Sequence, residues 1–161
     1  QGRMEFTHRA LGNRSILADP RGSKIKDFIN NAVKYRENFR PFAPAVMEEY
    51  SHIIFDINKS TKIDFMEKTV QVKTNWRKRL PAITHIDNSA RVQTVSKSYN
   101  EKFYNLIKEF YRITDVPVLV NTSFNLNGQP IVCDPTDAIK TFFSCGLDIL
   151  AIGDYVVMKD D

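Results

Sequence analysis

Residues 116–130 read VPVLVNTSFNLNGQP, in which an apolar run changes within one step into small polar residues. The aliphatic and β-branched residues at its start are typical of a buried strand, which we expect to end at Asn121. The hydrogen-bonding side chains at and after that end are Asn121, Thr122, Ser123 and Asn125. Gly128 follows and gives the backbone access to positive φ, which allows close approach to a ligand. The segment predicts a cradle for a polar, anionic group, although Asn and Ser residues that only cap a hairpin turn would give the same pattern.

The composition indicates one globular domain. The 161 residues are 42% hydrophobic, and a chain of this length buries roughly 70% of its unfolded surface on folding. No apolar run approaches the roughly 20 residues of a membrane span, and no signal peptide opens the sequence. We therefore expect a soluble, cytoplasmic protein. Cys133 and Cys145 belong to no C-x-x-C pattern, so we expect neither a zinc site nor a disulfide, and no metal ligands in this chain.

The net charge of +4 is concentrated at the start of the chain. Residues 1–40 hold nine Lys and Arg against four acids, whereas residues 41–161 hold fourteen against fifteen. Such a local excess among polar turns predicts a phosphate-sized anion site, and a solvated basic face is the alternative.

Arg9 and Arg14 lie in a loop before an expected short strand at 15–18. Their guanidinium groups could present planar forks to a phosphate. Surface ion pairs with Glu5 and Asp19 would explain the same arginines without a ligand. Because the sequence starts inside such a loop without an initiator methionine, we also expect it to be the tail of a longer protein.

A helix is expected from Ser23, its N-cap, because apolar residues recur at helical spacing over 25–33. Lys34 lies at the end of this helix, where a cation is favourable for the helix dipole alone. Arg40 lies in the segment FRPFAP at 39–44, where two prolines fix the backbone and two aromatic rings can hold the guanidinium stem.

The segment 82–95 predicts a hairpin around a turn at 87–88, with Arg91 and Gln93 on one face of its second strand. His85 precedes the turn and has no carboxylate partner in the sequence pattern, so a structural role is the simpler interpretation.

The rest of the chain mixes helices and strands. A capping box at 98–101 and an Asp-Pro start at 134–135 each open a helix, and the second helix should stop at Gly146. The last strand is expected at 149–158, with a turn or bulge at 153–154. Further strands are expected at 45–47 and 69–76. The absence of strict βαβ repetition favours an α+β fold, with a mixed, twisted β-sheet packed against helices in a single domain.

Five segments together carry a resemblance to a known family. They are RMEFTHRALGNRSIL (3–17), VKYRE (33–37), FRPFAP (39–44), ARVQTV (90–95) and NTSFNLNGQPIV (121–132). In this order they closely resemble the C-terminal domain of the O-carbamoyltransferases, the NodU/CmcH family of nodulation-factor, cephamycin and tobramycin carbamoylation enzymes. The resemblance covers nearly the whole chain. Two departures are Thr7-His8, where Gly-Pro is common, and Asn88, where Gly is usual.

The resemblance implies that residues 1–161 form a YrdC-like domain that binds carbamoyl phosphate and ATP, with Mg²⁺ on the phosphates, and makes carbamoyladenylate. It also implies a separate, larger N-terminal domain in the same polypeptide. That domain is iron-bearing and of the actin-like ATPase type, and it transfers the carbamoyl group to a hydroxyl of a sugar or natural product. Nothing in this chain resembles it.

By likeness, the catalytic residues are Lys34, Arg40 and Arg91. The residues that bind carbamoyl phosphate and ATP are Arg9, Arg14, Lys34, Arg36, Arg40, Arg91, Gln93, Asn121, Thr122, Ser123 and Asn125. Lys34-x-Arg36 and Ser123-x-Asn125 resemble the K-x-R and S-x-N signatures of YrdC-like proteins. A nucleic-acid-binding module and a non-catalytic docking domain are the alternatives. We do not expect nucleic acid as a partner, because the basic residues lie among glycines and prolines instead of stacking aromatics.

Overall fold

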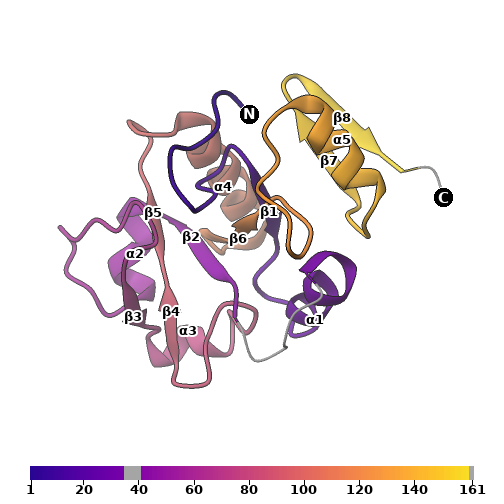
Figure 1. Ribbon diagram of the computed structural model, residues 1–161. Helices are drawn as coiled ribbons and strands as arrows, with labels where there is room; N and C mark the ends of the chain where they lie inside the picture. Colours follow the sequence, from indigo (N-terminus) through magenta and orange to yellow (C-terminus); the bar gives the residue numbers. More distant parts are fainter. Residues whose placement is uncertain (35–40, 160–161) are drawn as a thin grey trace.

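The computed structural model describes residues 1–34 and 41–159, and a four-stranded mixed sheet lies at its centre (Figure 1). In spatial order its strands are β1 (Ser15–Ala18), β6 (Val118–Ser123), β2 (Ala43–Met47) and β5 (Gln93–Val95). β6 is antiparallel to both of its neighbours, whereas β2 and β5 are parallel. These pairings confirm the predicted α+β class with a mixed sheet. The expected likeness to the YrdC fold stays a prediction.

The helices of the described residues are short apart from one. They are α1 (Ile25–Ile29), which continues as the π-helix η1 (Asn30–Lys34), α2 (Glu48–Ile54), α3 (Thr74–Arg77), α4 (Glu101–Thr114) and α5 (Pro135–Phe143). None of them combines the length and the apolar character that a membrane crossing requires.

Alternation along β6 divides the core between the two faces of the sheet. Leu119 packs with Phe103 and Ile107 of α4 on one face. Val118 and Val120 point to the opposite face, where they join the largest buried cluster. The predicted buried strand therefore exists, and it extends two residues beyond Asn121, to Ser123.

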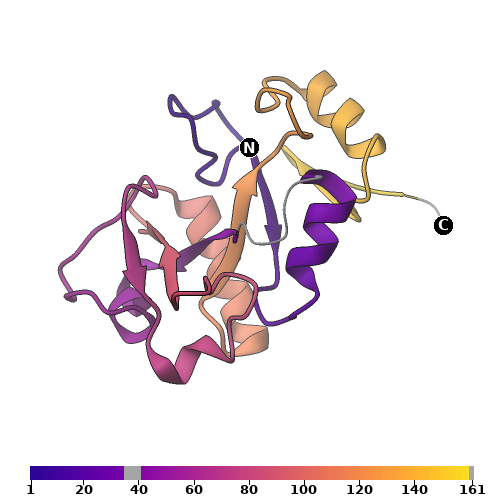
Figure 2. The ribbon, with the colours of Figure 1, turned by 60° about the horizontal axis from the view of Figure 1, so that its bottom comes forward.

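Two smaller sheets complete the fold. β3 (Thr69–Gln71) pairs with β4 (Ser89–Arg91), and β7 (Ile149–Ile152) forms a hairpin with β8 (Tyr155–Met158). The hairpin and α5 form a unit beside the central sheet, seen again in the turned view (Figure 2). A hydrophobic cluster that joins Phe142 and Leu150 to Ile16 of β1 and Val33 of η1 packs this unit against the central sheet.

The expected helix starts are partly wrong. Lys24, not Ser23, occupies the N-cap position of α1, and no side chain caps it there. Asn100, not Ser98, caps α4, because its Oδ1 accepts from the amide of Phe103 at 3.1 Å. An Asn side chain is a favoured N-cap, and Asn100 lies nearer in the chain than Ser98 to the first free amides of α4.

The third expected start, at Asp134 followed by Pro135, is confirmed, and the Asp134 carboxylate accepts from the amide of Asp137 at 2.9 Å. That helix ends at Phe143, before the expected stop at Gly146.

The predicted hairpin at 82–95 is wrong. Its second half is split between β4, which pairs with β3, and β5, which pairs with β2. Residues 82–88 form turns, in which Asn88 takes a φ of 65°. Long-range pairing has therefore replaced the local hairpin that the turn signal favoured. The expected strand at 69–76 is likewise shorter, because Thr74–Arg77 is helical and buries Trp76.

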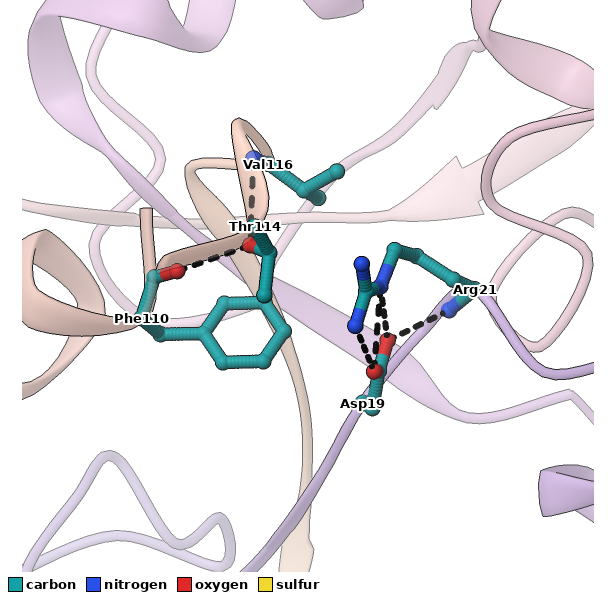
Figure 3. A network of polar contacts seen from close by, with 5 residues as sticks. All are labelled: Asp19, Arg21, Phe110, Thr114 and Val116. Atoms are coloured by element: carbon teal, nitrogen blue, oxygen red, sulfur yellow. Dashed lines mark hydrogen bonds and ion pairs between the residues drawn. The ribbon is translucent and has the colours of Figure 1, made fainter. Parts of the chain in front are cut away.

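A polar network lies at one end of the sheet, opposite the end that carries the polar residues 121–125 (Figure 3). The Arg21 guanidinium lies 2.6 Å from the Asp19 carboxylate and also over the ring of Phe110 in α4, 5.7 Å from its centroid. Thr114 Oγ1 donates to the Phe110 carbonyl and accepts from the Val116 amide. These contacts connect the end of β1, the end of α4 and the approach to β6.

Candidate anion-binding site

The topology of the central sheet gathers the predicted segments at one end. Because β6 is antiparallel to both neighbours, its last residues lie beside the first residues of β1 and β2. Ser123 is opposite Ser15, and Asn121 is opposite Ala43. β5 starts at the same end of the sheet. The basic loop before β1, the segment leading into β5 and the polar end of β6 therefore meet.

A cavity of about 90 Å³, here named the basic pocket, lies at this meeting point. Its lining residues are His8, Arg9, Ala10, Pro41, Phe42, Ala43, Met66, Arg91, Asn121, Thr122 and Ser123. Five predicted site residues are among them: Arg9, Arg91, Asn121, Thr122 and Ser123. The volume equals the share of about three liquid waters, which is the scale of a small anion. These residues include two arginines and neither Asp nor Glu, so the pocket favours an anion.

Lys34 lies behind the Ser123 wall of the pocket. Its side chain is buried, and Nζ donates to the backbone carbonyls of Ser123 and Asn125 at 2.6 and 3.0 Å. Nζ also lies 2.6 Å from Asn125 Oδ1 and 3.3 Å from Ser123 Oγ. The Ser123 hydroxyl donates to Asn125 Oδ1 at 2.6 Å. Lys34 of the first signature is thus in direct contact with Ser123 and Asn125 of the second, and its ammonium group fixes the turn that carries Ser123.

Two buried amides hold the Arg9 loop against the sheet. Gln93 Nε2 donates to the Leu11 carbonyl at 3.0 Å, and Asn121 Nδ2 donates to the Ala10 carbonyl at 3.1 Å. Asn121 Nδ2 also donates to Gln93 Oε1 at 2.8 Å. Both side chains are almost fully buried. Gln93 therefore contributes to the site by positioning its neighbours.

Asn121 has one polar atom left over. Within the described part of the chain, its Oδ1 is buried and has no hydrogen-bond partner. The amide orientation follows from its surroundings, because Nδ2 faces two oxygen acceptors. A buried acceptor without a donor is costly in a folded protein. Asn121 also lines the basic pocket, and a ligand N–H or O–H group that reached Oδ1 would satisfy it.

Arg14 lies outside the lining of the basic pocket. Its Nε and Nη2 donate to the Cys133 carbonyl at 3.2 and 3.0 Å. Its Nη1 donates to the carbonyls of Gln1, Gly2 and Asn13. The guanidinium group therefore fastens the first residues of the chain to the segment before α5.

Sequence reasoning missed the role of Glu5. Its Oε1 accepts from the amides of Leu11 and Asn13 at 2.8 and 2.7 Å, which folds the loop that carries Arg9. The Gly12 amide donates to Ser15 Oγ in the same loop. The sequence indicated Glu5 only as an ion-pair partner, and no motif predicts a carboxylate that binds loop amides. Met66 in the pocket wall gave no signal either.

Four other residues considered in the sequence lie away from the pocket or outside the described residues. Asn125 acts through Lys34, and its Nδ2 donates to the Gln129 carbonyl at 2.6 Å. Arg36 and Arg40 lie outside the described residues. His85 Nδ1 is 3.2 Å from Ser89 Oγ, and burial lowers the pKa of its imidazole.

The described residues offer little that would hold a metal ion. Residues 1–34 and 41–159 contain no cluster of three or more His, Cys, Asp or Glu side chains. Cys133 and Cys145 are free thiols. A second cavity, of about 270 Å³, lies between the loop at 126–132 and α5 and includes no predicted site residue.

Comparison with known proteins gives a consistent result. A family model described as Carbamoyltransferase C-terminus matches residues 1–159. Nodulation protein NolNO of Sinorhizobium fredii is 49% identical over 160 residues, which are 99% of this chain and 24% of that protein. Nodulation protein NolO of Bradyrhizobium diazoefficiens is 48% identical over 99% of this chain and 29% of its own. Nodulation protein U of Rhizobium tropici is 40% identical over 86% of this chain and 24% of its own. The chain thus spans less than a third of the length of these relatives.

Proposed function

Because the chain belongs to the carbamoyltransferase C-terminus family, we propose that it binds carbamoyl phosphate and ATP and forms carbamoyladenylate, as the activating half of an O-carbamoyltransferase. The observation that carries this proposal is the buried, unpaired Oδ1 of Asn121, a residue that lines a pocket together with two arginines. Carbamoyl phosphate has a matching pair of groups, because it joins an anionic phosphate to an NH₂ donor.

The pocket supplies a different partner for each end of this ligand. The Arg9 and Arg91 guanidinium groups are suited to the phosphate oxygens, since charge-assisted pairs with arginine are strong and directional. Asn121 Oδ1 would accept a hydrogen bond from the carbamoyl NH₂ group. The hydroxyls of Thr122 and Ser123 complete the polar wall.

The chemistry needs charge neutralisation and positioning more than a protein nucleophile. Hydrolysis of carbamoyl phosphate breaks its P–O–C link and gives carbamate and phosphate. A carbamate oxygen then attacks the α-phosphorus of ATP, and pyrophosphate leaves with the electrons of the broken P–O bond. Phosphoryl and nucleotidyl transfer depend on preorganised positive groups of the kind that Arg9 and Arg91 provide. We retain Lys34, Arg40 and Arg91 as proposed catalytic residues, and Lys34 would act here by holding Ser123.

We propose Mg²⁺ as a companion of ATP. The pocket lining contains no Asp or Glu, so the phosphate oxygens, not this chain, would supply most ligands of the ion, as is common for Mg²⁺. When bound, the ion would shield the phosphate charges. The proposed site therefore needs no carboxylate cluster.

The transfer step would belong to another domain. The relatives are more than three times as long as this chain, and we propose that their remaining part includes the iron-bearing domain that carbamoylates the acceptor hydroxyl. The chain alone would then bind carbamoyl phosphate and ATP in the cytoplasm, and it would not modify an alcohol. Nucleic-acid binding is the less favoured alternative, because the arginines converge on a small pocket instead of forming a stripe.

Calorimetry with ligand analogues tests this assignment. Carbamoyl phosphate should bind the chain about tenfold more tightly than acetyl phosphate, which has a methyl group in place of NH₂ and leaves Asn121 Oδ1 without a donor. Arg9→Ala and Arg91→Ala should each weaken carbamoyl phosphate by about ten- to a hundredfold, because each removes a charge-assisted pair. Arg3→Ala is the matched control, since Arg3 is exposed in the same loop and does not line the pocket.

Equal affinity for the two acyl phosphates, or an equal effect of all three arginine substitutions, would overturn the pocket assignment. Exchange of labelled pyrophosphate into ATP, dependent on added carbamoyl phosphate, tests the adenylation step separately. A salt-dependent shift of RNA by the chain would instead favour the nucleic-acid alternative.

A further inference from the structure

The β7–β8 hairpin has an outer face made only of apolar side chains. In an antiparallel pair, directly opposed residues share a face, and the register sets Ile149 opposite Met158 and Ala151 opposite Val156. All four side chains are exposed, with Ile149, Val156 and Met158 at 57%, 66% and 65%. We name these four residues the outer hairpin face.

The opposite face of the same hairpin packs against the rest of the domain. Leu150 is buried there, and Ile152 and Val157 pack around the same cluster with Phe142 of α5. An antiparallel sheet with one solvated face normally alternates apolar and polar residues. Apart from Tyr155, which is exposed beside the turn, this hairpin is apolar on both faces, which is the pattern of a sheet covered on both sides.

The first residue of the chain lies next to the tip of this hairpin. Gln1 Nε2 donates to the Gly153 carbonyl in the β7–β8 turn at 3.1 Å. Arg14 fixes the same segment through the carbonyls of Gln1 and Gly2. Figure 1 accordingly places the N-terminus beside the hairpin unit. A polypeptide that preceded residue 1 would therefore enter the domain beside the tip of the hairpin that carries the outer hairpin face.

We propose that the outer hairpin face is a docking surface for the part of the polypeptide that precedes this domain in longer family members. The relatives supply a candidate of sufficient size, because only 24% of the Sinorhizobium fredii protein matches this chain. The complementary surface would be apolar, since the outer hairpin face carries no charged or hydrogen-bonding side chain. The proposal rests on the assignment of a preceding domain under the proposed function, and not on the chemistry of the basic pocket.

Hydroxyl-radical footprinting tests this docking directly. The probe is a chimera in which this chain replaces the 160 matched residues of the S. fredii protein, compared with the chain alone. Modification of Val156 and Met158 should fall several-fold in the chimera. Ile113, which is 74% exposed in α4, is the internal reference and should be modified equally in both proteins.

Substitution of Val156 provides the second arm. Val156→Lys in the chimera should restore modification of Met158 to the level of the isolated chain, and Ile113→Lys should not. Val156→Thr keeps a β-branched strand residue and should give a smaller change in the same direction if the lysine variant fails to fold.

Unchanged modification of Met158 between chimera and isolated chain would overturn the proposal. Protection of Met158 in an isolated chain that light scattering shows to be a dimer would also overturn it, because a second copy would then cover the face. Neither readout depends on carbamoyl phosphate, so failure here leaves the pocket assignment standing.

Discussion

Lys34 Nζ lies 2.6 Å from Asn125 Oδ1, although 91 positions separate the two residues in the sequence. The contact joins the end of η1 to the turn that follows β6. Through the Ser123 carbonyl, the same ammonium group reaches the wall of the basic pocket. Lys34 thus connects the basic first quarter of the chain to the polar residues 121–125.

Lys34→Met should reduce both stability and ligand binding. Methionine has a similar length but donates no hydrogen bond, so the partly buried oxygens of Ser123 and Asn125 would lose their shared donor. Leaving such groups unsatisfied costs about 1–3 kcal/mol, and urea denaturation should show a lower midpoint with an unchanged slope. Calorimetry should show weaker binding of carbamoyl phosphate, because the Ser123 wall would no longer be fixed.

Lys102→Met is the control for this experiment, because Lys102 is an exposed residue of α4. It should leave the midpoint nearly unchanged. A Lys34→Met variant as stable as the native chain would show that the buried contacts do not support the turn.

Much of the central sheet could be predicted from local patterns. The apolar run at 116–120 and the strand at 15–18 carried clear signals, and the central sheet contains them as β6 and β1. The one strand expected at 149–158 is instead two strands, which form the separate β7–β8 hairpin around the expected turn at 153–154. The hairpin at 82–95 failed because a turn signal favours the nearest partner, whereas β4 and β5 pair with strands far away in sequence. Tertiary pairing outweighs local preference in such cases.

The candidate site could likewise be predicted only in part. Residue types indicated an anion site, and five predicted residues do line one pocket. The sequence could not separate a pocket residue such as Arg9 from a structural one such as Arg14, because both lie in the same loop with the same side chain. It also gave no indication of Glu5, whose role depends on where the loop amides point.

Arg14→Ala should lower stability without weakening carbamoyl phosphate binding. The substitution removes hydrogen bonds to the Cys133, Gln1 and Gly2 carbonyls, and their partial exposure limits the cost to about 1–2 kcal/mol. Urea denaturation and calorimetry on the same variant measure the two effects. If Arg14→Ala weakened binding as strongly as Arg9→Ala, Arg14 would belong to the ligand site after all.

Tyr104 and Glu49 make a pH-dependent contact between α4 and α2. Tyr104 Oη donates to Glu49 Oε1 at 2.5 Å, and this hydrogen bond to a carboxylate raises the pKa of Tyr104 to about 12. The raised pKa means that the contact stabilises the fold fully below the ordinary value of 10.0, and that this stability is lost as the pH rises toward 12.

Glu49→Gln should therefore return the pKa of Tyr104 toward 10.0. Phenolate absorbance, followed during a base titration, measures the change. Glu109→Gln is the control, because Glu109 pairs with Arg112 on the same helix and not with a tyrosine. An unchanged titration curve in Glu49→Gln would show that the tyrosine and the carboxylate do not interact in solution.

Gly12→Ala should disturb the Arg9 loop more than the addition of one methyl group suggests. Gly12 has a φ of 127°, and an added Cβ would lie 2.6 Å from the Phe103 ring of α4. Both the strained backbone and the overlap oppose the substitution, so we expect a loss of about 2–4 kcal/mol together with weaker carbamoyl phosphate binding.

Gly128→Ala is the matched control, because Gly128 also has a positive φ, of 75°, but its Cβ would meet no atom within 4 Å. It should cost only about 1 kcal/mol of backbone strain. Equal losses in the two variants would mean that backbone conformation alone requires Gly12, and that contact with Phe103 does not position the loop.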